Sequence, residues 1–141
     1  MERLKGEIIG RNWGIRSAES KAKILLQLKK MVEEMRSIPP PQGQGVSNVD
    51  GGLLWDCRLP GTLLCHEPFT TIYSFYKYLR GGFDAHPDQF PEVNKLIALQ
   101  NRHWLPPVFT HGDLSSLNVL VRGDQIVGII DWETAGWYPS Y

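Results

Sequence analysis

The chain has 141 residues, 42% of them apolar, and its fifteen basic residues balance fifteen acidic ones to a formal charge of zero. This length fits one domain with a modest core, and the charge balance argues against nucleic acid or an anionic membrane as a partner. The longest uncharged stretch, Ser37–Val49, is rich in Pro and Gly, whereas a membrane-spanning helix needs about 20 mostly apolar residues. No apolar segment typical of a secretory signal follows Met1, so we expect a cytoplasmic protein.

The first predicted helix covers residues 17–37, after an entry segment of residues 1–16. Ser17 can cap its start, and Pro39 lies beyond its end. Apolar residues within it recur at helical spacing and predict one stripe that faces the core. The stripe consists of Ile24, Leu25, Leu28, Met31, Val32 and Met35.

Residues 38–68 are predicted to form an irregular insert. Ile38–Gly52 contains three consecutive prolines and four glycines, which exclude a helix or a central strand. Gly43–Asn48 begins like a glycine-rich phosphate loop but lacks the third glycine, a preceding strand and a following helix, so we interpret it as a connector. Cys57 and Cys65 have neither CxxC nor zinc-finger spacing, and we expect both to be reduced thiols.

Two more helices are predicted within residues 69–105. The first runs from Thr70 to Arg80 and ends at two glycines. Its inward face is expected to contain Ile72, Phe75, Tyr76 and Leu79. The second runs from Asp88 to about Arg102, before a proline pair that forbids continuation. Its expected inward residues are Phe90, Val93, Leu96 and Ile97.

Residues 106–141 change to short β-type runs. Val108–Thr110 is a predicted strand, and Asn118–Val121 and Ile126–Ile130 form a predicted hairpin around a turn at residues 122–125. Asn118 begins one hairpin strand and Asp131 follows the other. Because these two ends are neighbours in an antiparallel pair, we expect the two side chains to lie at the same end of the hairpin.

The segment between the first of these strands and the hairpin has the order His-x-Asp-Leu-x-x-x-Asn, from His111 to Asn118. This is the spacing of the catalytic loop of protein kinases, and Asp131 stands where they place a metal-binding Asp. Phosphoryl transfer needs a carboxylate for the attacking hydroxyl and hard oxygen ligands for magnesium. Asp113 fits the first task, and Asn118 and Asp131 fit the second.

A purely structural interpretation treats Asp113 and Asn118 as turn-forming residues, since both favour loops by bonding to their own backbone. That interpretation leaves Asp131 unexplained. For His111 we favour a structural role, in which backbone hydrogen bonds hold the loop, over direct chemistry.

These residues carry a family resemblance. His111–Leu114, Asn118–Val121 and Gly128–Gly136 resemble the aminoglycoside phosphotransferase and choline kinase group, particularly the fungal phosphotransferase-family proteins, in which Gly112 replaces the protein-kinase Arg. Met1–Glu2 followed by Gly6–Ile9 is similar to the hinge and the first segment of the helical lobe of that family. Asn48–Gly52 with Glu67–Phe69 is similar to its fungal-type insert.

The resemblance implies an α+β fold: the mostly helical C-terminal lobe of a protein-kinase-like fold, with a short β-hairpin carrying the catalytic and metal residues. It also implies an ATP- and Mg²⁺-dependent phosphotransferase acting on a hydroxyl of a small molecule. The N-terminal nucleotide lobe, with a strand lysine, is absent from the expected fold, since Lys23 and Lys95 lie in helical patterns. We therefore expect a truncated chain that is inactive alone.

Two other functions remain open at this stage. The chain can be a pseudoenzyme or binding module that keeps the loop without the nucleotide lobe. A metal-dependent hydrolase built on His111, Asp113 and Asp131 is the third possibility, although no separate base for activating water is visible.

The acceptor is not identified by the sequence. Aromatic residues near the end of the chain can line a cationic or sugar pocket, although packing in the core is the favoured interpretation. They are Trp132, Trp137, Tyr138 and Tyr141. Glu133 can bind a substrate amine or form an ion pair.

Overall fold

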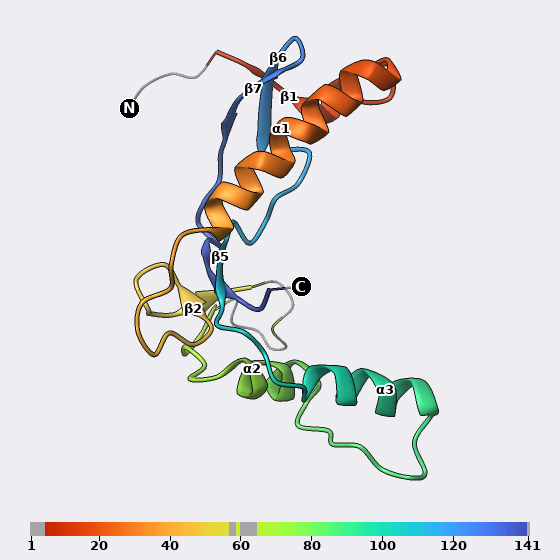
Figure 1. The fold of residues 1–141 in the computed structure, drawn as a ribbon, viewed down its shortest axis with the longest axis vertical. Coiled ribbons are helices and arrows are strands. Elements are labelled where there is room, and N and C mark those ends of the chain that lie inside the picture. The colour runs from red at the N-terminus through yellow and green to blue at the C-terminus, as the bar shows by residue number, and fades with distance from the viewer. Residues whose placement is uncertain (1–4, 57–58, 60–64, 141) are drawn as a thin grey trace.

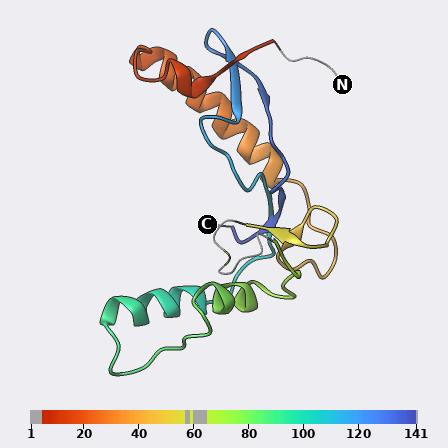
Figure 2. The ribbon, with the colours of Figure 1, turned by 180° about the vertical axis from the view of Figure 1, so that it is seen from behind.

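The computed structural model describes residues 5–56, 59 and 65–140, which form an elongated molecule of three α-helices and short antiparallel strands (Figures 1 and 2). The α+β fold class is therefore confirmed. The expectation of reduced thiols concerns Cys57 and the side chain of Cys65, which lie outside the described residues. None of the helices in the described ranges is long and apolar enough to cross a membrane.

The strands of the described residues form three small sheets. The first has the order β1 (Glu7–Ile8), β6 (Val119–Arg122) and β7 (Gln125–Ile129). The second has the order β2 (Ser47–Asn48), β8 (Gly136–Tyr138) and β5 (Val108–Thr110). The third pairs β3 (Leu54–Trp55) with β4 (Cys65–His66). The predicted strand at 108–110 and the predicted hairpin are thus confirmed, with the hairpin turn at residues 123–124.

Helix α1 (Ala18–Arg36) packs along the β6–β7 hairpin at one end of the molecule (Figure 1). As expected, Ser17 caps its start by accepting a hydrogen bond from the Ser20 backbone N–H at 3.1 Å. A short 3₁₀ helix, η1 (Ile9–Arg11), precedes it. The contact is made by what we call the hairpin cluster: Ile9, Ile24, Val119, Val121 and Ile126.

The predicted stripe of α1 is only partly correct. Ile24 is fully buried and Leu28 and Met31 pack against the hairpin cluster, but Leu25 is 52% exposed. The small sheet of β1, β6 and β7 covers less of the helix surface than a broad sheet would. Leu25 therefore lies at the edge of the stripe and stays in contact with solvent.

The central sheet connects the two ends of the molecule. Its middle strand, β8, pairs with β2 on one side and β5 on the other, with Thr110 opposite Gly136. Gly136 is required here because a Cβ would collide with the Ser47 carbonyl of β2. Because Thr110 ends β5 and Gly136 begins β8, the loop that follows β5 and the turn that precedes β8 lie next to each other.

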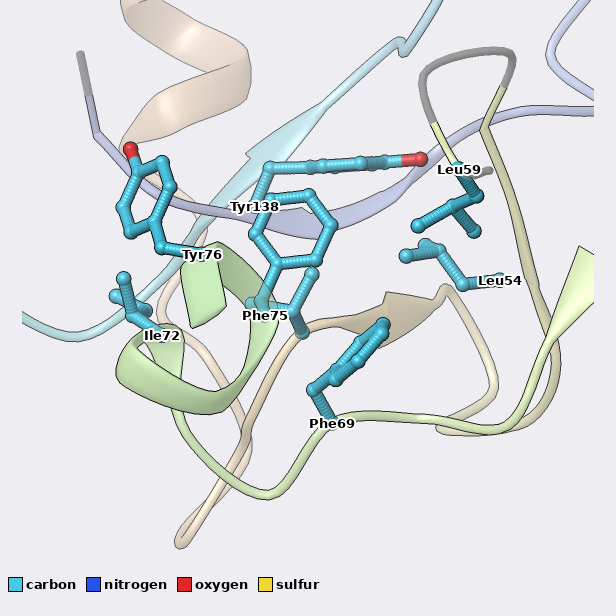
Figure 3. Packing of buried hydrophobic residues seen from close by; sticks show 8 residues of the cluster. Leu54, Leu59, Phe69, Ile72, Phe75, Tyr76 and Tyr138 are labelled. Atoms are coloured by element: carbon cyan, nitrogen blue, oxygen red, sulfur yellow. The ribbon is translucent and has the colours of Figure 1, made fainter. Parts of the chain in front are cut away.

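Helix α2 (Ile72–Leu79) lies below the central sheet in Figure 1. It starts with a reciprocal capping box in which Thr71 and Ser74 bond to each other's backbone N–H groups. Its inward face completes what we call the aromatic cluster: Val46, Leu54, Leu59, Phe69, Ile72, Phe75, Tyr76 and Tyr138. Figure 3 shows the Phe75 ring between those of Tyr138 and Phe69, and both pairs are edge-on. The inward face predicted for this helix is confirmed, with Leu79 only partly buried.

Helix α3 (Pro91–Gln100) projects at the far end of the molecule (Figures 1 and 2). The inward face predicted for it is wrong at three of four positions. Ile97 is 2% exposed, but Phe90 is 78% exposed, and Val93 and Leu96 are also exposed. The helix extends past α2, so within the described part of the chain only the side around Ile97 is covered.

Candidate functional site

His111 is the buried centre of the region that the sequence indicated. Its side chain is fully buried directly after β5. The Asp113 backbone N–H donates to Nδ1 at 3.3 Å, so Nδ1 is an acceptor and Nε2 carries the proton. Nε2 donates to the carbonyl of Ile130 at 2.9 Å. A single neutral imidazole therefore bonds both to its own loop and to the residue before Asp131.

Asn118 ties the loop of residues 111–118 together. Its side-chain Nδ2 donates to the Asp113 backbone carbonyl at 2.9 Å and to the carboxylate Oδ2 at 3.0 Å. Asn118 is buried, while the carboxylate-bearing residue Asp113 is exposed at the surface. Two backbone bonds, from Ser115 N–H to Asp113 and from Asn118 N–H to Ser115, fold the loop between them. This arrangement holds an exposed carboxylate on a loop that is closed by its own hydrogen bonds.

Asp131 follows β7 and is the only described non-glycine residue with a positive φ angle, +66°. Asp tolerates this left-handed conformation better than most residues, yet it is sparsely populated and clusters at functional sites. The Ile130 N–H donates to the Asn118 carbonyl at 2.9 Å, which extends the hairpin ladder to the residue before Asp131. The structure thus places Asn118 and Asp131 at the same end of the hairpin, as the antiparallel pairing predicted.

Residues from elsewhere in the chain hold this loop in place. The Gly10 N–H of η1 donates to the Ser116 carbonyl at 3.1 Å, so the entry segment contacts the middle of the loop. Trp132 lies against the His111 ring with the centroids 4.5 Å apart and stacks on Phe109. Trp132 thus covers one side of the buried imidazole.

Thr134 is a site residue that the sequence reasoning missed. Its Oγ1 donates to the His111 carbonyl at 3.1 Å across 23 positions of sequence. A lone threonine in a turn carries no signal for such a contact, because the contact depends on the pairing of β5 with β8. Of the terminal aromatic residues, Trp137 and Tyr138 are buried in the core, Trp132 is partly exposed, and Tyr141 lies outside the described residues.

The donor set favours a hard cation only if substrate oxygens complete its shell. Among the described residues there is no group of three or more His, Cys, Asp or Glu side chains that could hold a metal ion. Both nitrogens of His111 already bond to the backbone, so this residue is not a free ligand. The oxygen donors are the Asn118 amide and the carboxylates of Asp113 and Asp131, and oxygen ligands suit magnesium. The hydrolase site built on His111 therefore lacks its nitrogen ligand.

Comparison with known protein families gives a match that extends over residues 1–141. The family is described as the phosphotransferase enzyme family. No curated protein and no solved structure matches the chain significantly.

Proposed function

The chain belongs to the phosphotransferase enzyme family, and we propose that its function is to transfer a phosphoryl group from ATP to a hydroxyl group of a small molecule. The observation that carries this proposal is the pair of links made by Asn118. Its side chain binds Asp113, and its backbone binds Ile130, the neighbour of Asp131. Asn118, itself a candidate metal ligand, thereby links the candidate base to the segment that carries the second candidate ligand.

Asp113 is the proposed base. A carboxylate within hydrogen-bond reach of the acceptor hydroxyl can orient it and accept its proton. Asn118 Nδ2 occupies the carboxylate oxygen Oδ2, which fixes the side chain in one orientation. We therefore assign the other oxygen, Oδ1, to the acceptor hydroxyl.

Asn118 and Asp131 are the proposed ligands for Mg²⁺. Both bonds of the Asn118 amide use its nitrogen, so Oδ1 is the atom that it can offer to a cation. Magnesium is usually bound by one or two carboxylates together with substrate phosphates, which agrees with the small donor set of this chain. When bound with ATP, the ion would neutralise negative charge on the transferring phosphate.

We propose that the chain corresponds to the helical C-terminal lobe of a kinase-like fold. Sites of that kind use a strand lysine to contact the nucleotide phosphates. The lysines of this chain lie in α1, α2 and α3, apart from Lys5, which precedes β1. These residues alone are therefore expected to be inactive and to need a nucleotide-binding lobe.

The proposed acceptor is a small molecule, and neither nucleic acid nor a membrane is proposed as a binding partner. The formal charge of zero leaves no excess of positive charge for a polyanionic partner. Trp132 and Glu133 follow Asp131 directly and are exposed, so they are the side chains proposed to contact the acceptor.

The proposal is tested with Asp113→Asn, which keeps the shape of the side chain and removes its basicity. We expect kcat to fall by about 10²-fold or more while the affinity for ATP stays nearly constant. The assay is coupled ADP release by the protein encoded by the complete reading frame, with choline, an aminoglycoside and glycerol as acceptors. Asp50→Asn, in an exposed loop, is the matched control and should keep wild-type turnover.

Two results would contradict the proposal. Unchanged turnover in Asp113→Asn would show that Asp113 is not the base. ATP binding without turnover for any acceptor would favour the alternative, a pseudoenzyme or binding module that keeps the loop.

A further inference from the structure

The candidate site is built from two loops, the loop of residues 111–118 and the loop of residues 131–135. Thr134 lies where these two loops are in contact. Its hydroxyl donates to the His111 carbonyl at 3.1 Å. The contact is so close that a Cβ at position 112 would collide with the Thr134 carbonyl and lie 2.6 Å from its Oγ1. Gly112, with a φ of +88°, therefore creates the space that Thr134 fills.

Residues on both sides of Asp131 form hydrogen bonds with His111. On the N-terminal side of Asp131, the Ile130 carbonyl accepts from His111 Nε2 at 2.9 Å. On the C-terminal side, Thr134 donates to the carbonyl of the same histidine. Asp131 between them adopts a left-handed φ of +66°, a sparsely populated conformation that the surrounding bonds help to maintain. The two bonds to His111 constrain Asp131 from both directions along the chain.

The Thr134 carbonyl is held from the opposite side. The buried Tyr138 hydroxyl lies 3.1 Å from the Thr134 carbonyl and 3.2 Å from that of Trp55 in β3, and it can donate to either. The turn of residues 132–135 is closed by a bond from the Ala135 N–H to the Trp132 carbonyl. Thr134 is thereby fixed to the rigid core as well as to the loop.

We propose that Thr134 is a positioning residue whose hydroxyl keeps the Asp131 carboxylate in register with the loop of Asp113 and Asn118. This inference rests on the proposed function, because it assigns the register to phosphoryl transfer. Threonine hydroxyls in turns usually bond to nearby backbone atoms. This one bonds across to the other loop, and a valine of the same shape cannot replace that bond.

Two pairs of variants isolate the hydroxyl. Wild type and Thr134→Val differ by a hydroxyl against a methyl of similar size, and Thr134→Ser and Thr134→Ala differ by the hydroxyl alone. The second pair decides the question if the valine variant folds poorly. Thr110→Val is the matched control, because Thr110 Oγ1 donates to the Val108 carbonyl within its own strand, β5.

The first measurement does not depend on activity. Hydrogen exchange of the backbone amides of Asp113, Ser115, Asn118 and Ile130 reports how often the loop of residues 111–118 opens, because these amides bond within the loop or join it to the end of β7. We expect exchange to be about fivefold faster in Thr134→Val and Thr134→Ala, the effect of one net hydrogen bond. Thr134→Ser and Thr110→Val should exchange like wild type, and amides in the middle of the β6–β7 ladder should stay protected in all variants.

The second measurement is steady-state kinetics on the protein from the complete reading frame. We expect kcat to fall about tenfold in Thr134→Val, with KM for ATP and acceptor within about twofold, and recovery in Thr134→Ser. A protein without turnover refutes the proposed function, whereas the exchange data still show whether the hydroxyl holds the loops. Exchange that is equal in Ser and Ala variants, or kcat that is unchanged in Thr134→Val, overturns the role of Thr134.

Discussion

Gly112 shows how a single backbone position limits the site. Its φ of +88° is unfavourable for any residue with a Cβ, and a Cβ there would also collide with the Thr134 carbonyl. Gly112→Ala should therefore lower the free energy of unfolding by more than about 1 kcal/mol, because strain and collision act together. The measurement is urea unfolding at neutral pH.

Gly123 provides the matched control for this prediction. It also has a positive φ, +61°, but no atom lies within 4 Å of a Cβ built there. Gly123→Ala consequently carries the strain without the collision. Equal losses of stability in the two variants would show that the Thr134 contact does not restrict position 112.

At this scale, the sequence indicated the residues but not their connections. Asp113, Asn118 and Asp131 could be selected because their spacing along the chain follows a known chemical requirement, and their roles remain predictions. The hydrogen bond from Thr134 to His111 and the contact of the Trp132 ring with the His111 ring depend on which strands pair. The spacing of residues along the chain does not contain that information.

Among the elements, the end of α2 carries the clearest electrostatic link. The Lys77 ammonium donates to the Asp84 carboxylate at 3.0 Å, and Arg80 lies 3.3 Å from the same carboxylate. The hydrogen bond from Lys77, followed by that from Arg80, holds the pKa of Asp84 below its ordinary value of 3.8. The hydrogen bond and charge of Asp84 raise the pKa of Lys77.

The lowered pKa of Asp84 predicts a stability difference that depends on pH. Because the folded carboxyl has the lower pKa, its contribution is complete above the unfolded value of 3.8 and is lost as the pH falls through the folded value. Asp84→Asn should therefore be slightly less stable than wild type at pH 7, with the gap closing below about pH 3.8. The effect is small because the pair is exposed and screened by salt.

Urea midpoints between pH 7 and pH 3, at low and high salt, measure this difference. The corresponding difference in stability between wild type and Asp50→Asn, a change in an exposed loop, serves as the baseline. A gap between wild type and Asp84→Asn that stays constant over the whole pH range would contradict the ion-pair origin.

Elements with a strong local pattern were predicted well, and the others were not. The helix at 18–36 and the hairpin at 119–129 have clear periodicity and turn residues. Strands β2, β3 and β4 have two residues each, too few to show alternation, and they form only because β8 and neighbouring segments offer edges to pair with. The error at Phe90 and Leu96 arises because a periodic apolar face shows what a helix can bury, not what covers it.

In the whole molecule, the candidate site lies between two separate centres of packing. The hairpin cluster holds β6 and β7 against α1, and the aromatic cluster holds β8 against α2. The loop of residues 111–118 connects β5 to β6 and therefore bridges the two (Figure 1). The geometry of the site depends on both clusters, although neither contains Asp113 or Asp131.

This arrangement predicts how the 141-residue chain behaves with nucleotide. A kinase-type site binds ATP through two sets of contacts. A loop and a strand lysine contact the phosphates, and Asn and Asp ligands hold the metal ion. Only the metal ligands are proposed for this chain, and they are Asn118 and Asp131. We therefore expect a dissociation constant for ATP with Mg²⁺ of about a millimolar or weaker, equivalent to roughly 4 kcal/mol or less, and no phosphoryl transfer by the chain alone.

Calorimetric titration of the purified chain, with Asp131→Asn as the comparison, measures the affinity, and an ADP-release assay measures turnover. Micromolar binding accompanied by turnover that depends on Asp113 would show that these residues suffice and would refute the assignment of the chain to one lobe.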